Sequence, residues 1–395
     1  MASRGESTLL CDSSKSSSRS HVMKSTADTN PKYWSEYSNL QRTKHELIKH
    51  YLNGWFPKLG YWSGRIIYFD THAGRGMHAG GQLGSPLVAL RTLMEHRFRD
   101  ELLKRSEVVF FFIERDESNL ASLRQEIQSL GELPKRIVIR TIASDCFAAL
   151  SSLVASFEQR KMRLAPALLF VDPYGFKVPG KILKDLMKFQ RVELLVNVIW
   201  RELDMAISQG SKPGMAETLN LVFDGTEWRE RIVSPHFDER ADQAVDLLRE
   251  KIGARWATFV RMLGENRATR YFLLHLTNHD DGRDLMKDCT WKICPEGGFY
   301  VRKSDDRSQQ FLITPEPNLM PLREWVLSKL GHGPHRWQEL IEQIRPEIWR
   351  SPHLNSVLRE LRQEGKIVSE GKFVPSSNPT LRLSESIHQI DQSKS

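Results

Sequence analysis

Five near-continuous apolar runs that alternate with helical patterns constrain the fold of this chain most strongly. The runs lie at residues 65–70, 108–114, 137–142, 167–172 and 193–199. Apolar runs of this kind are expected of strands that are covered on both faces, and the segments between them show helical periodicity. Regular alternation of strand and helix predicts an α/β fold built on a doubly wound, mostly parallel sheet.

The segments around these runs extend the domain, which we place at residues 31–314. A helix with regularly spaced apolar residues is expected at 44–55, just before the first strand. Further strands that would complete the sheet are expected at 270–277, 298–301 and 310–313.

Residues 201–262 are predicted to form a helical insertion in this domain. Their pattern is mainly helical, and Trp228, Phe237, Trp256 and Phe259 would supply its apolar core. The domain is therefore expected to carry a cap or insertion beside the sheet.

Both ends of the chain differ in composition from this domain. Residues 1–30 are rich in Ser, Thr, Lys and Asp with hardly any large apolar residue, so we expect them to be disordered. Pro315 and Pro317 mark a domain boundary, because consecutive X-Pro units favour extended linker geometry. Residues 376–395 show no apolar core and are expected to form a flexible tail.

A separate small module is expected at residues 320–375. Three amphipathic helices would be followed by two short strands within 365–374, joined by a tight turn. This is the layout of a winged helix-turn-helix, a module that contacts nucleic acid or docks proteins.

Composition narrows the class of protein. The net charge of +8 over 395 residues favours an acidic partner, with nucleic acid first. No apolar run approaches the roughly 20 residues of a membrane span, so no membrane association is expected. The four cysteines form no C-x-x-C pair, which argues against a zinc site and a disulfide scaffold and favours a reducing, cytoplasmic setting.

The first strand ends in a motif suited to a nucleotide-like cofactor. Asp70 is followed by the turn His72-Ala73-Gly74-Arg75-Gly76. Glycines there let the backbone approach a ligand closely, and the aspartate can hold the cationic amino group of S-adenosylmethionine. The alternative is a tight strand-to-helix turn without a ligand, in which His72 is a packing residue.

Acidic residues at the ends of the next two strands extend this candidate cofactor site. Glu114 ends the second strand, where a carboxylate can accept hydrogen bonds from both ribose hydroxyls. Asp145 follows the third strand and is placed to meet the adenine amino group, although a helix-capping aspartate fits its position equally well.

The fourth strand ends in Asp172-Pro173-Tyr174-Gly175-Phe176. A turn of this kind places a carboxylate and carbonyl oxygens where they can accept both hydrogens of an exocyclic amine, so that its lone pair faces a methyl donor. Tyr174 or Phe176 could stack a flipped base. An ordinary strand-to-loop turn is the alternative, because Asp-Pro favours turn initiation.

These motifs resemble those of the three-Cys-motif partner protein family, bacterial proteins with a class I methyltransferase-like fold. The resemblance covers about residues 35–375 and is carried by residues 43–46, 70–76, 84–87, 170–176, 196–197, 277–279, 286–287 and Trp291. It implies S-adenosylmethionine as cofactor, a winged helix at the C-terminal end, and a companion protein that bears three cysteines.

Residues 70–76 and 84–87 are also similar to segments of adenine-N6 methyltransferases that act on large-subunit ribosomal RNA. The similarity implies methyl transfer to an amino group. The second turn of such enzymes is usually Asp-Pro-Pro-Tyr, whereas here Tyr174 and Gly175 occupy the third and fourth places. The nature of the amine is therefore left open.

The sequence predicts an S-adenosylmethionine-dependent methyltransferase that acts on an exocyclic amino group, with adenine N6 in nucleic acid as the first candidate. The alternative is a non-catalytic partner protein that keeps the fold and binds nucleic acid or a companion protein through its winged helix. A nicotinamide enzyme is disfavoured, because the turn at Gly74 and Gly76 lacks the third glycine of the dinucleotide fingerprint.

Overall fold

The computed structural model describes residues 37–264, 267–295, 297, 299–302 and 316–384. The segment 1–30, for which disorder is expected, and the strand expected at 310–313 both lie outside the described residues.

The main domain is built on an eight-stranded sheet with the order β3-β2-β1-β4-β5-β7-β6-β8. Its strands are β1 (Arg65–Asp70), β2 (Glu107–Glu114), β3 (Ile137–Ala143), β4 (Ala167–Val171), β5 (Val192–Val198), β6 (Trp256–Leu263), β7 (Thr269–Thr277) and β8 (Tyr300–Arg302). Strands β1 to β5 pair in parallel, and β7 runs antiparallel to both β5 and β6. The predicted α/β fold with a mostly parallel sheet is therefore confirmed.

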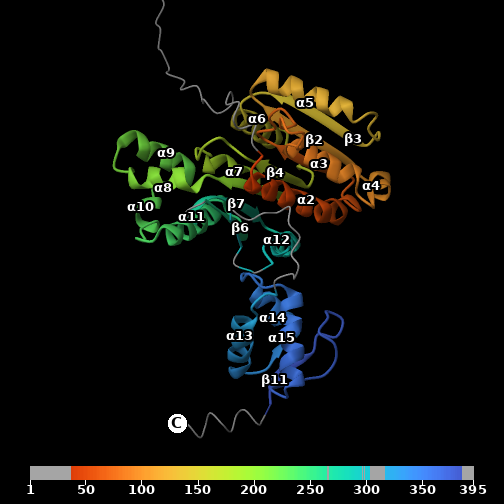
Figure 1. The fold of residues 1–395 in the computed structure, drawn as a ribbon, viewed down its shortest axis with the longest axis vertical. Coiled ribbons are helices and arrows are strands. Elements are labelled where there is room, and N and C mark those ends of the chain that lie inside the picture. The colour runs from red at the N-terminus through yellow and green to blue at the C-terminus, as the bar shows by residue number, and fades with distance from the viewer. Residues whose placement is uncertain (1–36, 265–266, 296, 298, 303–315, 385–395) are drawn as a thin grey trace, which may run out of the picture.

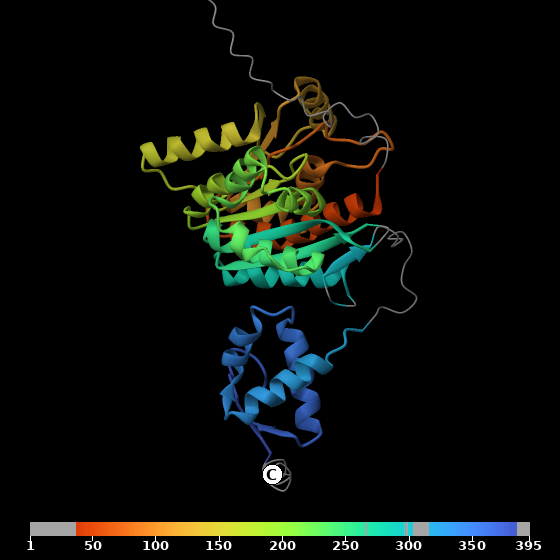
Figure 2. The ribbon, with the colours of Figure 1, turned by 90° about the vertical axis from the view of Figure 1, so that its left-hand side faces the viewer.

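Helices cover both faces of this sheet (Figures 1 and 2). One face carries α2 (Asn39–Gly60), α3 (Ser85–Met94), α4 (Arg99–Arg105), α5 (Glu117–Ser129) and α12 (Asp280–Ile293). The other carries α6 (Cys146–Gln159), α7 (Gly180–Met187), α8 (Trp200–Ser208), α9 (Pro213–Phe223), α10 (Trp228–Arg231) and α11 (Phe237–Ile252). Each layer buries its own apolar cluster against the sheet, which explains why the central strands read as continuous apolar runs.

The insertion expected at 201–262 ends earlier than predicted. Its helices stop at Ile252, and residues Trp256–Leu263 form strand β6, which pairs with β7 and β8. Burial in β6 largely alternates along the strand, as expected of a strand with unlike faces. The helical prediction is wrong here because the helical spacing of Trp256 and Phe259 falls on a strand that pairs with β7.

The C-terminal unit has three helices and a three-stranded sheet of order β10-β11-β9. Its elements are α13 (Met320–Gly331), β9 (His335–Arg336), α14 (Trp337–Ile344), α15 (Ser351–Gln363), β10 (Ile367–Ser369) and β11 (Thr380–Leu383). Figure 1 shows it in blue beneath the main domain, next to α12.

The second strand of its hairpin differs from the prediction. It is Thr380–Leu383 and does not lie within 365–374; it pairs with β10 and buries Leu381 in the core of the unit. The expectation of a flexible tail from residue 376 is wrong for this strand, because Leu381 packs where no core residue was expected. Residues 385–395 lie outside the described part of the chain.

Candidate active site

Two aspartates lie at the carboxyl ends of adjacent strands. Asp70 ends β1, Asp172 directly follows β4, and the two strands pair in parallel with Asp70 opposite Phe170. The pairing continues past the strand, because the amide of Thr71 donates to the carbonyl of Phe170 at 3.0 Å. Ligands bind at this edge of open parallel sheets, so both predicted motifs reach the same side of the molecule.

The glycine turn after β1 is tied to the end of β2. The amide of Gly74 donates to Glu114 Oε2 at 2.8 Å, and the amide of Asp116 donates to Glu114 Oε1, also at 2.8 Å. Gly74 has φ 63° and Gly76 has φ 88°, a region in which a residue with a Cβ is strained. The structure thus gives the Glu114 carboxylate a role that the sequence did not suggest, which is to fix the shape of the turn.

Asp70 is completely buried, with 0% of its surface exposed. Its Oδ1 accepts a hydrogen bond from the amide of His72 at 3.3 Å, whereas its Oδ2 has no hydrogen-bond partner among the described residues. Burial raises the pKa of Asp70 to about 7, and the negative charge of Asp172 contributes. The Ser85 hydroxyl, the His72 amide and the Lys44 ammonium lower this pKa. A buried acceptor of this kind is consistent with the expectation that Asp70 holds a cationic amino group.

Asp172 is held from two sides. The ammonium of Lys44 donates to Oδ2 of Asp172, and the amide of Asn197 donates to Oδ1 at 2.6 Å. Burial raises the pKa of Asp172, but the Lys44 ammonium and the two hydrogen bonds outweigh burial and hold the pKa below its ordinary value. The carboxylate is therefore ionised and fixed in orientation.

Neither Lys44 nor Asn197 was predicted as a site residue from the chemistry of the sequence. Both belong to the short segments 43–46 and 196–197 that carried the family resemblance, and this was the available signal. Lys44 reaches Asp172 from α2, whose N-terminus is fixed by a capping box in which the amide of Gln41 donates to Ser38 Oγ at 3.2 Å. Asn197 lies near the end of β5, beside β4.

A cavity of about 150 Å³ opens at the same edge of the sheet. Five predicted site residues from four segments line it: His72, Glu114, Asp145, Pro173 and Tyr174. The structure thus brings together residues of the cofactor motif and residues of the amine motif. The other predicted residues, which are Asp70, Ala73, Gly74, Gly76, Asp172 and Phe176, are not among those that line this cavity.

The residues that line the cavity differ in the contacts that they make. Asp145 caps α6 by accepting from the amide of Ala148 at 3.0 Å, which is the capping arrangement that its position also allowed. His72 Nε2 lies 3.4 Å from the sulfur of Cys146, whose pKa burial raises to about 12. Tyr174 is 37% exposed at the cavity, whereas Phe176 packs against the apolar core. Of the two predicted aromatic residues, Tyr174 and not Phe176 thus lies where a ligand in the cavity can reach it.

Within the described ranges, no three His, Cys, Asp or Glu side chains are grouped so that they could hold a metal ion. The helices of the described part include none that is both long and apolar enough to cross a membrane.

Comparisons with known proteins add little to this geometry. No family model and no curated protein matches the chain. A solved Legionella pneumophila protein of the DUF519 family is similar over 65% of this chain and 98% of its own, with 14% identity and a TM-score of 0.36. A protein from Methanococcus maripaludis, assigned as an S-adenosyl-L-methionine-dependent methyltransferase, is similar over 58% of this chain and 84% of its own, with 10% identity and a TM-score of 0.27. The α/β fold of this chain is read from its own strand order and not from these similarities.

Proposed function

We propose that this chain is an S-adenosylmethionine-dependent methyltransferase that acts on an exocyclic amino group, with adenine N6 in nucleic acid as the first candidate. The observation that carries the proposal is the buried Oδ2 of Asp70, which has no hydrogen-bond partner among the described residues and lies one strand away from Asp172. An unpaired buried carboxylate oxygen is costly, so its presence supports a site built for a cationic ligand.

The residues of the first motif fit the proposed cofactor. When bound, S-adenosylmethionine supplies an electrophilic methyl group on a sulfonium. Asp70 would hold its amino group, and the turn of Ala73, Gly74 and Gly76 would let the backbone approach its methionine end. Glu114, whose carboxylate accepts from the amides of Gly74 and Asp116, would also accept from the ribose hydroxyls.

Asp145 and His72 would complete the cofactor side. Both line the cavity beside Glu114, where Asp145 would meet the adenine amino group. Asp145 also caps α6, and its second oxygen would make this contact.

The second motif would orient the acceptor. Asp172 would accept one hydrogen of the amine, the Pro173 carbonyl would accept the other, and Tyr174 would stack the ring. Lys44 and Asn197 would keep the Asp172 carboxylate ionised and correctly turned while the amine is held. Phe176 would support this turn from the core side.

The family, the partners and the location are also proposals. The motifs favour a three-Cys-motif partner protein of the bacterial cytoplasm, with a companion protein that bears three cysteines. The net charge of +8 and the element order of the C-terminal unit, which is that of a winged helix, favour a nucleic acid partner.

A second candidate is a non-catalytic partner protein with the same fold. The engagement of both Asp172 oxygens, by Lys44 and by Asn197, favours it, because an amine would share acceptors that are already used. In this case the cofactor pocket would serve stability or regulation, and the C-terminal unit would do the binding.

One set of measurements tests both candidates. Calorimetry is expected to show S-adenosylmethionine binding at micromolar strength, and transfer of labelled methyl groups to total RNA or DNA is measured with and without the companion. Asp172→Asn is expected to abolish transfer while it leaves cofactor binding intact. Asp185→Asn on α7, which does not line the cavity, is the matched control. Binding without any transfer would favour the partner protein, and no binding at all would refute the methyltransferase.

A further inference from the structure

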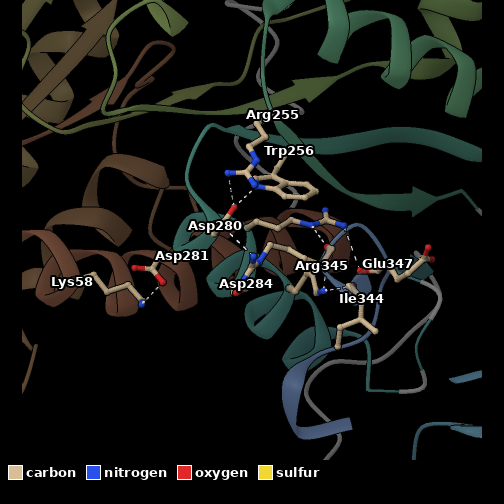
Figure 3. A network of polar contacts seen from close by, with 11 residues as sticks. Lys58, Arg255, Trp256, Asp280, Asp281, Asp284, Ile344, Arg345 and Glu347 are labelled. Carbon is tan, nitrogen blue, oxygen red and sulfur yellow. Dashed lines mark hydrogen bonds and ion pairs between the residues drawn. The ribbon is translucent and has the colours of Figure 1, made fainter. Parts of the chain in front are cut away.

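The described part of the C-terminal unit meets the main domain through helix α12, and the contact has a regular plan. Arg283, Lys287 and Trp291 recur every four residues on α12, so they lie on one face. Asp280, Asp284 and Asp288 form a second row with the same spacing. Figure 3 shows part of this network, with Asp280 and Asp284 beside Arg345.

The first row donates to backbone carbonyls where α14 ends. Arg283 Nε donates to the carbonyl of Arg345 at 3.1 Å, and its Nη2 donates to that of Pro346 at 2.6 Å. Lys287 Nζ donates to the carbonyl of Ile344 at 3.2 Å. The last carbonyls of a helix have no partner within the helix, so α12 satisfies the groups that the end of α14 leaves open.

Trp291 extends the contact into the turn between α14 and α15. Its Nε1 donates to the carbonyl of Ile348 at 2.7 Å, and its ring stacks on Trp349 with centroids 5.9 Å apart. His353, in the first turn of α15, packs edge-on against the same ring at 4.4 Å. The turn and the start of α15 therefore lie on the end of α12.

The second row of α12 holds the arginines of this turn. Arg345 forms ion pairs with Asp280 at 3.0 Å and with Asp284 at 3.4 Å, and Arg350 pairs with Asp288 at 3.3 Å. Arg345 and Arg350 flank the turn between α14 and α15, and the aspartates of α12 neutralise both of them.

The two basic side chains of the first row are almost completely buried. Arg283 is 5% exposed and Lys287 is 2% exposed. Burying a charge is costly unless it is paired or hydrogen-bonded, and here backbone carbonyls supply the hydrogen bonds. Two buried basic side chains that donate to the carbonyls of one turn make the contact a specific interface.

In a DNA-reading helix-turn-helix, the N-terminal residues of the second helix enter the major groove. We propose that α12 covers the turn between α14 and α15 and the start of α15. The C-terminal unit can then bind duplex DNA through α15 only after α12 releases this turn. The inference rests on the proposed winged-helix nature of the unit and is independent of the methyltransferase site.

The direction in which DNA affinity changes when basic residues of α12 are replaced tests the proposal. The double variant Arg283→Met and Lys287→Met removes the positive charge of Arg283 and the amine of Lys287, whose pKa burial lowers to about 7. By electrostatics alone this loss of positive charge should weaken DNA binding. Release of the turn should instead strengthen it. We expect a larger radius of gyration in small-angle scattering and at least fivefold tighter binding of a labelled 30-base-pair duplex, measured by anisotropy of the full chain.

Controls separate release from other effects. Lys104→Met with Lys181→Met removes two exposed charges elsewhere and should only weaken binding. If the first variant does not fold, the double variant Asp284→Ala and Asp288→Ala weakens the same contact between α12 and the turn. The double variant Asp100→Ala and Glu101→Ala removes the same charge elsewhere and is its control. The gain should vanish when Arg359→Glu is added on the exposed side of α15. Release without tighter binding would overturn the proposal, and so would folded joint variants that keep the wild-type radius of gyration.

Discussion

Lys44 on α2 forms a partly buried ion pair with Asp172, which lies 128 residues away at the end of β4. The side chains are 6% and 14% exposed. A pair in this setting stabilises only while both members are present, because each alone is a charge removed from water. The pair therefore couples the position of the leading helix to the geometry of the proposed acceptor site.

Removal of Lys44 should expose this coupling. Lys44→Met is expected to lower the free energy of unfolding by about 3 kcal/mol, since it leaves the Asp172 carboxylate without its cation. Asp172→Asn in the same chain should recover most of the loss, because no unpaired charge remains. Urea denaturation of the two single variants and the double variant measures this as a double-mutant cycle. Additive losses would mean that the pair contributes no coupling.

Asp70 should make the stability of the protein depend on pH. Its pKa is raised from 3.8 to about 7, chiefly by burial, so the folded state binds a proton that the unfolded state has released. The stabilisation is complete below about pH 4 and is lost as the pH rises through 7. Asp70→Asn should therefore gain stability at pH 8 relative to the wild type, on the order of 4 kcal/mol at most, and little at pH 4.

Denaturant titrations of both proteins at pH 4, 6 and 8 check this expectation. The matched control is Asp116→Asn, a surface cap whose pKa is lowered by its hydrogen bonds to Ser118 and Asn119, so its loss should cost stability at pH 8. Equal effects of the two substitutions at pH 8 would contradict a raised pKa for Asp70.

The same titration should appear in cofactor binding. An ammonium group binds the ionised carboxylate of Asp70, so affinity for S-adenosylmethionine should fall about tenfold for each pH unit below 7. Lys44 and Asp172 face the same group and act in opposite directions on it, so the midpoint should shift downward in Asp172→Asn. Calorimetry in two buffers of different ionisation enthalpy should record the release of about one proton at pH 6. Affinity that stays constant from pH 6 to 8 would remove Asp70 from the site.

Local patterns predicted the parallel strands well, because β1, β2, β4 and β5 are buried on both faces and their apolar runs are continuous. Strand β6 escaped prediction because Trp256 and Phe259 are three residues apart, which is helical spacing. The side chains that alternate into the core of β6 are Thr258, Val260 and Met262. Strand β11 escaped because one buried residue, Leu381, anchors it. Asp70 and Asp172 were predicted from their places at strand ends, whereas Lys44 and Asn197 meet Asp172 only through the tertiary fold, which no local pattern encodes.

Gly76, in the turn after β1, should be sensitive to substitution. Its φ is 88°, and an added Cβ would lie 2.8 Å from Cδ1 of Leu123 and 3.5 Å from its Cα. Gly64 has φ 73° with nothing within 4 Å, so Gly64→Ala reports the backbone strain alone. We expect Gly64→Ala to cost about 1 kcal/mol of unfolding free energy, and Gly76→Ala to cost about 1 kcal/mol more because Leu123 must move.

The two variants should also differ in cofactor binding. Gly76 lies in the turn whose Gly74 amide is tied to Glu114, so a shift of this backbone should lower S-adenosylmethionine affinity at least tenfold. Gly64 precedes β1 at the opposite end of the strand, and its substitution should leave affinity unchanged. Thermal unfolding and calorimetry on both variants separate the two effects. If Gly76→Ala binds the cofactor like the wild type, the turn does not contact it, and the cofactor must be held by the cavity around Glu114 and Asp145 alone.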